Sequence, residues 1–217
     1  MKKILSGPII KPENQTVRNA IIFLHGYGAN GNDLISIGDL WKNSLQETIF
    51  FSPNAPFNCA WSSDAYQWFD LTSISPDKIG EGLKTAGPFL NDYIDKIKAD
   101  YHLGLESIFF VTFSQGTMMA LYHLCKRKDK CAGIMGYSGL LFQDETFDSE
   151  VKSKFPIKLY HGKDDDVLDH SQTISAAEKF NLLEFDIEYK IQNNLGHGID
   201  NEGLEFGLNF IKKTFNI

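Results

Sequence analysis

The stretch that decides the fold is VTFSQGTMMALY, residues 111–122. The apolar run IFFVTF leads into it, and the helix-like segment TMMALYHLCK follows it. Ser114 therefore lies at a turn from a strand into a helix, where a tight and strained backbone can present a nucleophilic serine. Gly116 supplies the small residue that such a turn needs on its helix side. Thr112 stands where glycine is usual on the strand side, so we expect local strain there.

A serine in front of a helix is more often an N-cap than a nucleophile. The turn alone therefore leaves both interpretations of Ser114 open. A nucleophilic serine needs a base and a carboxylate that orients the base. In proteins that carry this type of turn, the acid and then the histidine follow the serine along the chain.

Short apolar runs alternate with helix-like stretches on both sides of this turn. We expect strands at residues 20–25, 49–52, 108–113, 132–137, 157–161 and 185–191, and helices at residues 33–45, 79–101, 117–126, 171–180 and 201–214. Several strands are almost continuous in Ile, Phe and Val, as in parallel strands covered on both faces. The alternation predicts an α/β fold with a mostly parallel central sheet and helices on both faces. We expect residues 1–217 to form a single domain, with Pro88 kinking or restarting its helix.

Composition excludes several classes of protein. The formal net charge is −7, which argues against a nucleic-acid-binding surface. Apolar runs are too short for a membrane span, so we expect no stable membrane insertion. Lys2 and Lys3 are followed by too short an apolar run for a secretory signal. The three cysteines form no CxxC pair, which is typical of reduced thiols in a cytoplasmic protein.

Four histidines follow Ser114 and could act as its base. His123 lies inside the helix after the turn, where a packing or surface role is expected. His161 ends a strand, and His170 precedes a helix, where it could simply be solvated. His197 is our choice, because it follows the last strand and glycines on both sides suit a loop that delivers a ring to a fixed point.

Three consecutive residues, Asp164, Asp165 and Asp166, are candidates for the carboxylate. All three follow the strand IKLYHG and could lie at the carboxyl edge of the sheet, where ligands bind in open α/β folds. Three adjacent side chains cannot all point inward, and periodicity does not choose among them.

A glycine-containing loop, GYGANG at residues 26–31, follows the first strong strand. Such a loop can offer backbone N–H groups to a developing oxyanion. The expected pair of donors is the N–H of Tyr27 and the N–H of Gln115, directly after the serine. A phosphate-binding loop is the alternative, but the segment lacks a GK[ST] ending and does not fit GxGxxG.

Seven segments in order carry a resemblance to a known family: LHGYGANGNDL, PNAPF, YQWFDL, FSQGTMMAL, YSGLL, HGKDDDVLD and GHGI. Together they resemble the phospholipase/carboxylesterase family of α/β-hydrolases, which includes bacterial carboxylesterases and acyl-protein thioesterases. The resemblance spans residues 21–197 and implies an α/β-hydrolase fold.

The family pattern H-G-x-x-D implies Asp165 as the acid, with Asp164 as second choice. The resemblance also implies Tyr27 and Gln115 as the oxyanion donors. The implied activity is hydrolysis of carboxylic esters, thioesters or lysophospholipids through an acyl-enzyme on Ser114, with no metal and no organic cofactor. Thr112 departs from the family's glycine, and Asp169 stands where proline is common.

The alternatives are a catalytically weakened hydrolase that only binds a ligand, with Thr112 as its sign, and a plain interaction module. A dienelactone-hydrolase-like enzyme would be expected to carry cysteine at the nucleophile. The expected partner is a small-molecule ester or acylated substrate, and a homodimer is left open. Residues expected to line an acyl pocket are Trp61, Trp68, Phe69, Leu140 and Leu141, although Trp68 and Phe69 could equally pack beneath their loop.

Overall fold

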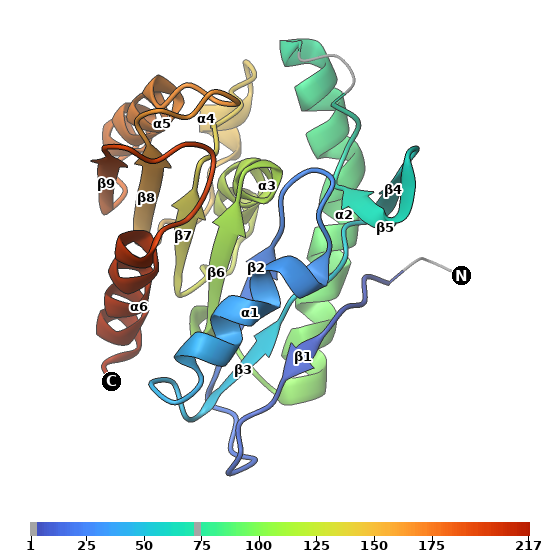
Figure 1. The fold of residues 1–217 in the computed structure, drawn as a ribbon, viewed down its shortest axis with the longest axis vertical. Coiled ribbons are helices and arrows are strands. Elements are labelled where there is room, and N and C mark those ends of the chain that lie inside the picture. The colour runs from blue at the N-terminus through green and yellow to red at the C-terminus, as the bar shows by residue number, and fades with distance from the viewer. Residues whose placement is uncertain (1–3, 72–74) are drawn as a thin grey trace.

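The apolar runs form one seven-stranded sheet in the computed structural model, which describes residues 4–71 and 75–217 (Figure 1). The strand order is β1-β3-β2-β6-β7-β8-β9. The bounds are β1 Ile9–Ile10, β2 Asn19–Leu24, β3 Thr48–Phe51, β6 Ile108–Phe113, β7 Gly133–Tyr137, β8 Ile157–Gly162 and β9 Ile187–Gln192. Only β1 pairs antiparallel within this sheet, against β3, so the predicted mostly parallel sheet is confirmed.

Helices cover both faces of this sheet, as the sequence predicts. One face carries α1 (Gly31–Trp41) and α6 (Asn201–Phe215), which lie in front of the sheet in Figure 1. The other carries α2 (Pro76–Tyr101), α3 (Gln115–His123) and α5 (Ser171–Leu182). The remaining helices of the described residues are α4 (Phe147–Glu150) and two 3-10 helices, Leu105–Ser107 and Leu124–Lys126.

The continuous apolar character of the strands follows from this two-sided burial. In β2, Ile21 and Phe23 pack with α1 and α6, whereas Ile22 and Leu24 pack with α2 and α3. All four side chains are fully buried. Because successive side chains in a strand point to opposite faces, both sets must be apolar in a central strand.

Pro88 lies inside α2 without interrupting it, so the expected restart of the helix is wrong. Proline lacks a backbone N–H, so position 88 cannot donate to the carbonyl of Lys84, four residues earlier. The neighbouring carbonyl of Leu83 accepts a hydrogen bond from Nε2 of His123 at 2.9 Å. The His123 ring packs directly on Gly87, where a Cβ atom would lie 2.4 Å from it. His123 is thus a packing residue, and burial lowers its pKa to about 4.

Residues 53–76, for which the sequence predicts neither a strand nor a helix, contain a hairpin. Its strands are β4 (Phe57–Cys59) and β5 (Ser62–Gln67), paired antiparallel. Residues 72–74 of that segment lie outside the described residues. In the described parts of the chain, no helix is both long and apolar enough to traverse a bilayer.

Candidate active site

Ser114 forms the turn between β6 and α3 with φ 52° and ψ −115°, a conformation that non-glycine residues rarely adopt. Although Ser114 occupies the N-cap position of α3, its side chain makes no capping hydrogen bond. Its N–H donates to the carbonyl of Tyr137 at 2.9 Å, which ties the turn to β7. The strained turn therefore leaves the Ser114 hydroxyl available for another partner.

The residues two positions before and two positions after Ser114 allow the close approach of β6 and α3 in different ways. Gly116 lies so close to β2 that a Cβ atom would stand 2.0 Å from the Leu24 carbonyl oxygen, so only glycine fits there. Thr112, in place of the usual glycine, is fully buried opposite Gly136 of β7. Its hydroxyl lies 3.0 Å from that of Thr117. A glycine on the adjacent strand and a hydroxyl partner on α3 thus accommodate the branched side chain.

His197 reaches the serine from the loop between β9 and α6. Figure 1 shows this loop crossing above the carboxyl ends of β8 and β7 toward the start of α3. Nε2 of His197 lies 3.1 Å from Oγ of Ser114, and the ring packs against Phe113. The structure brings together two residues that are 83 positions apart in the sequence.

Asp165 is the member of the acidic run that contacts His197. Its Oδ2 lies 2.7 Å from Nδ1 of His197, and its side chain is fully buried. Asp164 and Asp166 are exposed. Burial raises the pKa of Asp165, but hydrogen bonds from the Leu168 N–H, from His197 and from the Val167 N–H outweigh it and hold that pKa below its ordinary value.

The loop after β2 lies against the nucleophile. A Cβ atom on Gly26 would approach that of Ser114 to 3.2 Å. Two backbone N–H groups of this loop already have acceptors. The N–H of Gly28 donates to the carbonyl of Tyr66 at 2.9 Å, and the N–H of Ala29 donates to the carbonyl of Gly26. Gln115 is the first residue of α3, so its N–H has no intrahelical acceptor.

Buried polar side chains clamp this loop to the nucleophile turn. The amide of Gln115 accepts from the Trp68 N–H at 2.8 Å and donates to the Phe69 carbonyl at 2.7 Å. The Trp68 indole N–H donates to the carbonyl of His25 at 3.0 Å. Nε2 of His25 accepts the Ala55 N–H, and burial lowers the pKa of His25 to about 4, so the ring stays neutral.

The five residues expected to line an acyl pocket occupy different depths. Trp61 is 66% exposed, and its ring lies against Gly28. Leu140 is half-buried, whereas Leu141 is buried. Trp68 and Phe69 are buried, which favours the interpretation that they pack beneath their loop, and Phe69 also lines a surface hollow together with Phe57 and Gln67. The side-chain amide of Gln115 holds the backbone of Trp68 and Phe69 in the interior through its two hydrogen bonds.

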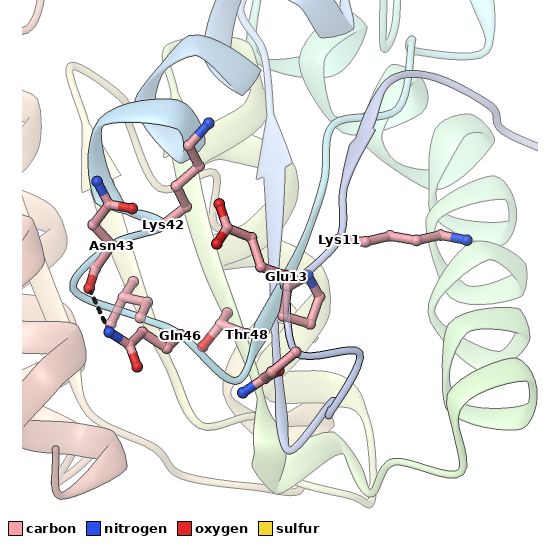
Figure 2. A pocket seen from close by; sticks show the side chains of 9 residues that line it. Lys11, Glu13, Lys42, Asn43, Gln46 and Thr48 are labelled. Carbon is pink, nitrogen blue, oxygen red and sulfur yellow. Dashed lines mark hydrogen bonds between the residues drawn. The ribbon is translucent and has the colours of Figure 1, made fainter.

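A surface hollow lies at the amino ends of β2 and β3, away from Ser114 (Figure 2). Its lining includes Lys11, Glu13, Lys42, Gln46 and Thr48. Ligands of open α/β sheets bind at the opposite, carboxyl edge. Figure 2 also shows Lys11 pointing away from the rest of the set. We therefore assign no catalytic role to this hollow.

Sequence reasoning missed the contacts of three polar side chains near Ser114 and Asp165. His25 and the side chain of Gln115 hold the segments around the loop after β2, and Thr173 contacts His161. His161 contacts Asp165, and the only signal of this contact in the sequence is that the two residues are four positions apart. Asp169, which stands where the family commonly has proline, precedes the N-cap residue of α5 and accepts the Ser171 N–H at 2.9 Å.

Comparison with known proteins gives concordant results. The family model of phospholipases/carboxylesterases matches residues 5–215. Acyl-protein thioesterase 1 of Schizosaccharomyces pombe is 32% identical over 171 residues, covering 74% of this chain and 74% of that protein. Acyl-protein thioesterase 1 of Gibberella zeae is 26% identical over 224 residues, covering 95% of each. The crystal structure of esterase PE8 is 34% identical, with a TM-score of 0.94, and the match covers 98% of this chain and 100% of that one.

Proposed function

The chain belongs to the phospholipase/carboxylesterase family, and from that premise we propose that Ser114, His197 and Asp165 are its catalytic triad. Its fold is that of an α/β-hydrolase, and it is a carboxylesterase-type hydrolase. The observation that carries the triad proposal is the continuous set of contacts from Ser114 Oγ to His197 and on to Asp165, at 3.1 and 2.7 Å.

The first half of the reaction forms an acyl-enzyme. Ser114 Oγ attacks the carbonyl carbon of the ester, and its proton passes to Nε2 of His197. Asp165 holds Nδ1–H of the ring and stabilises the imidazolium that results. Collapse of the tetrahedral intermediate breaks the bond to the alcohol, or to the thiol of a thioester, and the leaving group takes the proton from His197.

The second half returns the free enzyme. Water attacks the acyl carbonyl while His197 accepts one of its protons, and the ester bond to Ser114 breaks as Oγ regains that proton. The products are a carboxylic acid and the free serine, so the cycle consumes only water. No metal or organic cofactor takes part in these steps.

We assign the oxyanion hole to the N–H groups of Tyr27 and Gln115. Two features support this assignment: the close approach of Gly26 to Ser114, and the lack of an intrahelical acceptor for the Gln115 N–H. Such donors stabilise the negative charge of the tetrahedral intermediate by about 3–4 kcal/mol each. The clamp formed by His25, Trp68 and the Gln115 amide keeps them in place before substrate arrives.

The proposed substrate is a small ester or thioester whose acyl group lies along the apolar rim near Trp61 and Leu140. An apolar wall favours aliphatic over charged acyl groups. Acyl-protein thioesterases are among the relatives, so S-acylated proteins and lysophospholipids are candidates beside short esters. We further propose that residues 1–217 act as a single domain in the cytoplasm, either alone or as a homodimer.

Hydrolysis of p-nitrophenyl esters by wild type and Ser114→Ala tests the proposal. We expect measurable turnover by the wild type and a loss of kcat of roughly 10⁴-fold or more in the variant, without change in the thermal unfolding midpoint. Folded wild-type protein that hydrolyses no ester or thioester would instead favour a ligand-binding role. Turnover that survives in the variant would place the nucleophile elsewhere.

A further inference from the structure

A second histidine contacts the acid from the side opposite His197. Nε2 of His161 lies 3.0 Å from Oδ2 of Asp165, the same oxygen that contacts His197. The other oxygen, Oδ1, accepts the N–H groups of Val167 and Leu168 at 2.9 and 2.8 Å. The buried carboxylate of Asp165 is therefore contacted by two backbone N–H groups and by two imidazole rings.

The contacts of His161 fix its tautomer. Nε2 also lies 2.9 Å from the carbonyl of Leu168, so both of its neighbours are acceptors and Nε2 must carry the proton. Nδ1 lies 2.8 Å from Oγ1 of Thr173. In the neutral ring Nδ1 is an acceptor, so the Thr173 hydroxyl donates to it. The side chain of His161 is fully buried, and burial lowers its pKa, which keeps the ring neutral.

We propose that His161, whose Nδ1 accepts the Thr173 hydroxyl, is a positioning residue that aims the Asp165 carboxylate at His197. The inference rests on the proposed triad. A neutral donor fixes the carboxylate without cancelling its charge, which stays available to stabilise the His197 imidazolium. A cationic residue at position 161 would compete for that charge. Neither His161 nor Thr173 touches the reacting atoms.

The pair His161→Leu and His161→Gln tests this role. Leucine removes the donor, whereas the side-chain amide of glutamine can place an N–H near the position of Nε2. For a p-nitrophenyl ester, we expect leucine to lower kcat about 10- to 100-fold with little change in KM, and glutamine to restore most of kcat. An unchanged kcat in His161→Leu, or equal losses in the two variants, would overturn the proposal.

Thr173 gives a milder test in case His161→Leu does not fold. Thr173→Val keeps the shape but removes the hydroxyl, and Thr173→Ser keeps it. We expect a lower kcat only in the valine variant, with both unfolding midpoints close to wild type. Equal kcat in the valine variant, the serine variant and the wild type would contradict the positioning role assigned to the pair of Thr173 and His161.

A double substitution separates positioning from general damage. In an Asp165→Asn background, His161→Leu should lower kcat no further, because the group through which it acts is already lost. Full additivity of the two losses would refute the proposal. If wild type neither hydrolyses esters nor reacts at Ser114 with a fluorophosphonate, the proposed function fails and this inference with it. An active wild type with an unaffected His161→Leu variant refutes this inference alone.

Discussion

The nucleophile turn and the β4–β5 hairpin both lie against the loop after β2 but differ in how they are held. Ser114 is strained, buried and tied to β7, and the Asp165 that serves its proposed base is contacted by two backbone N–H groups and two imidazole rings. Trp61, between β4 and β5, is 66% exposed and packs on Gly28. The comparison indicates that the two regions have different roles. The strand ends hold the proposed catalytic residues in place, whereas the hairpin is free to differ in sequence and so to suit different acyl groups.

The largest effect is expected in the buried region, at the acid. Asp165→Asn should lower kcat by roughly 10³- to 10⁴-fold, because the amide favours the wrong tautomer of His197. Asp164→Asn is the matched control, since this neighbour is exposed, and it should change kcat less than about twofold. Ester hydrolysis measures both. Similar losses of kcat in the two variants would mean that the summed negative charge of the acidic run supports catalysis, and not the carboxylate of Asp165 alone.

Alanine substitutions at two glycines near Ser114 and His197 should differ in their effect on the free energy of unfolding. Gly116→Ala places a Cβ atom 2.0 Å from the Leu24 carbonyl oxygen and should lower the free energy of unfolding by at least ~2 kcal/mol. At Gly198, beside His197, no described atom beyond the two adjacent residues lies within 4 Å of a Cβ, so Gly198→Ala should stay within ~0.5 kcal/mol of wild type. Urea unfolding compares them. A stable Gly116→Ala protein would contradict the tight contact between α3 and β2.

The supporting histidines predict how stability changes with pH. His25 and His123 take up a proton at pH 6.5 when unfolded but only near pH 4 when folded. Below pH 6.5 the unfolded chain therefore binds more protons, and the free energy of unfolding should fall as the pH drops from 6.5 to 4, by up to roughly 3 kcal/mol for each ring.

Urea unfolding at several pH values checks this, with His123→Gln as the comparison. Glutamine does not titrate and can still donate to the Leu83 carbonyl, so the variant should show a shallower decline. A free energy of unfolding that stays constant or rises between pH 6.5 and 4 would be incompatible with buried neutral rings.

The smallest effect is expected at the hairpin. Trp61→Ala should lower kcat/KM for longer acyl chains by roughly 3- to 10-fold while leaving the shortest ester nearly unchanged. Leu40→Ala on α1 is the matched control, since Leu40 is also 66% exposed. A series of p-nitrophenyl esters measures the profile. An unaltered chain-length preference in Trp61→Ala would remove Trp61 from the acyl wall.

The parts of the fold that the sequence predicted share one physical origin. Central strands such as β6 are buried on both faces, so their apolar runs are visible in the sequence. The hairpin was missed because β4 has three residues and β5 is largely polar, which gives no periodic signal. The continuity of α2 through Pro88 was not predicted either, and its contact with His123 joins residues that are distant in sequence.

The site shows the same limit. Ser114 and His197 stand in recognisable turns, and the structure places their side chains within hydrogen-bond distance. The choice of Asp165 over its neighbours needed either the family pattern or coordinates, because three consecutive acids look alike in sequence. The clamp from Gln115 to Trp68 and the contact of Thr173 with His161 join residues whose partners no local pattern can reveal.

The most direct test of the proposed triad is to locate the reactive nucleophile. Wild-type protein would be treated with a fluorophosphonate probe, digested and sequenced by mass spectrometry. We expect the probe on Ser114, much slower labelling of folded His197→Ala, and none in Ser114→Ala. A probe found on another residue, or a folded wild-type protein that remains unlabelled, would contradict the account.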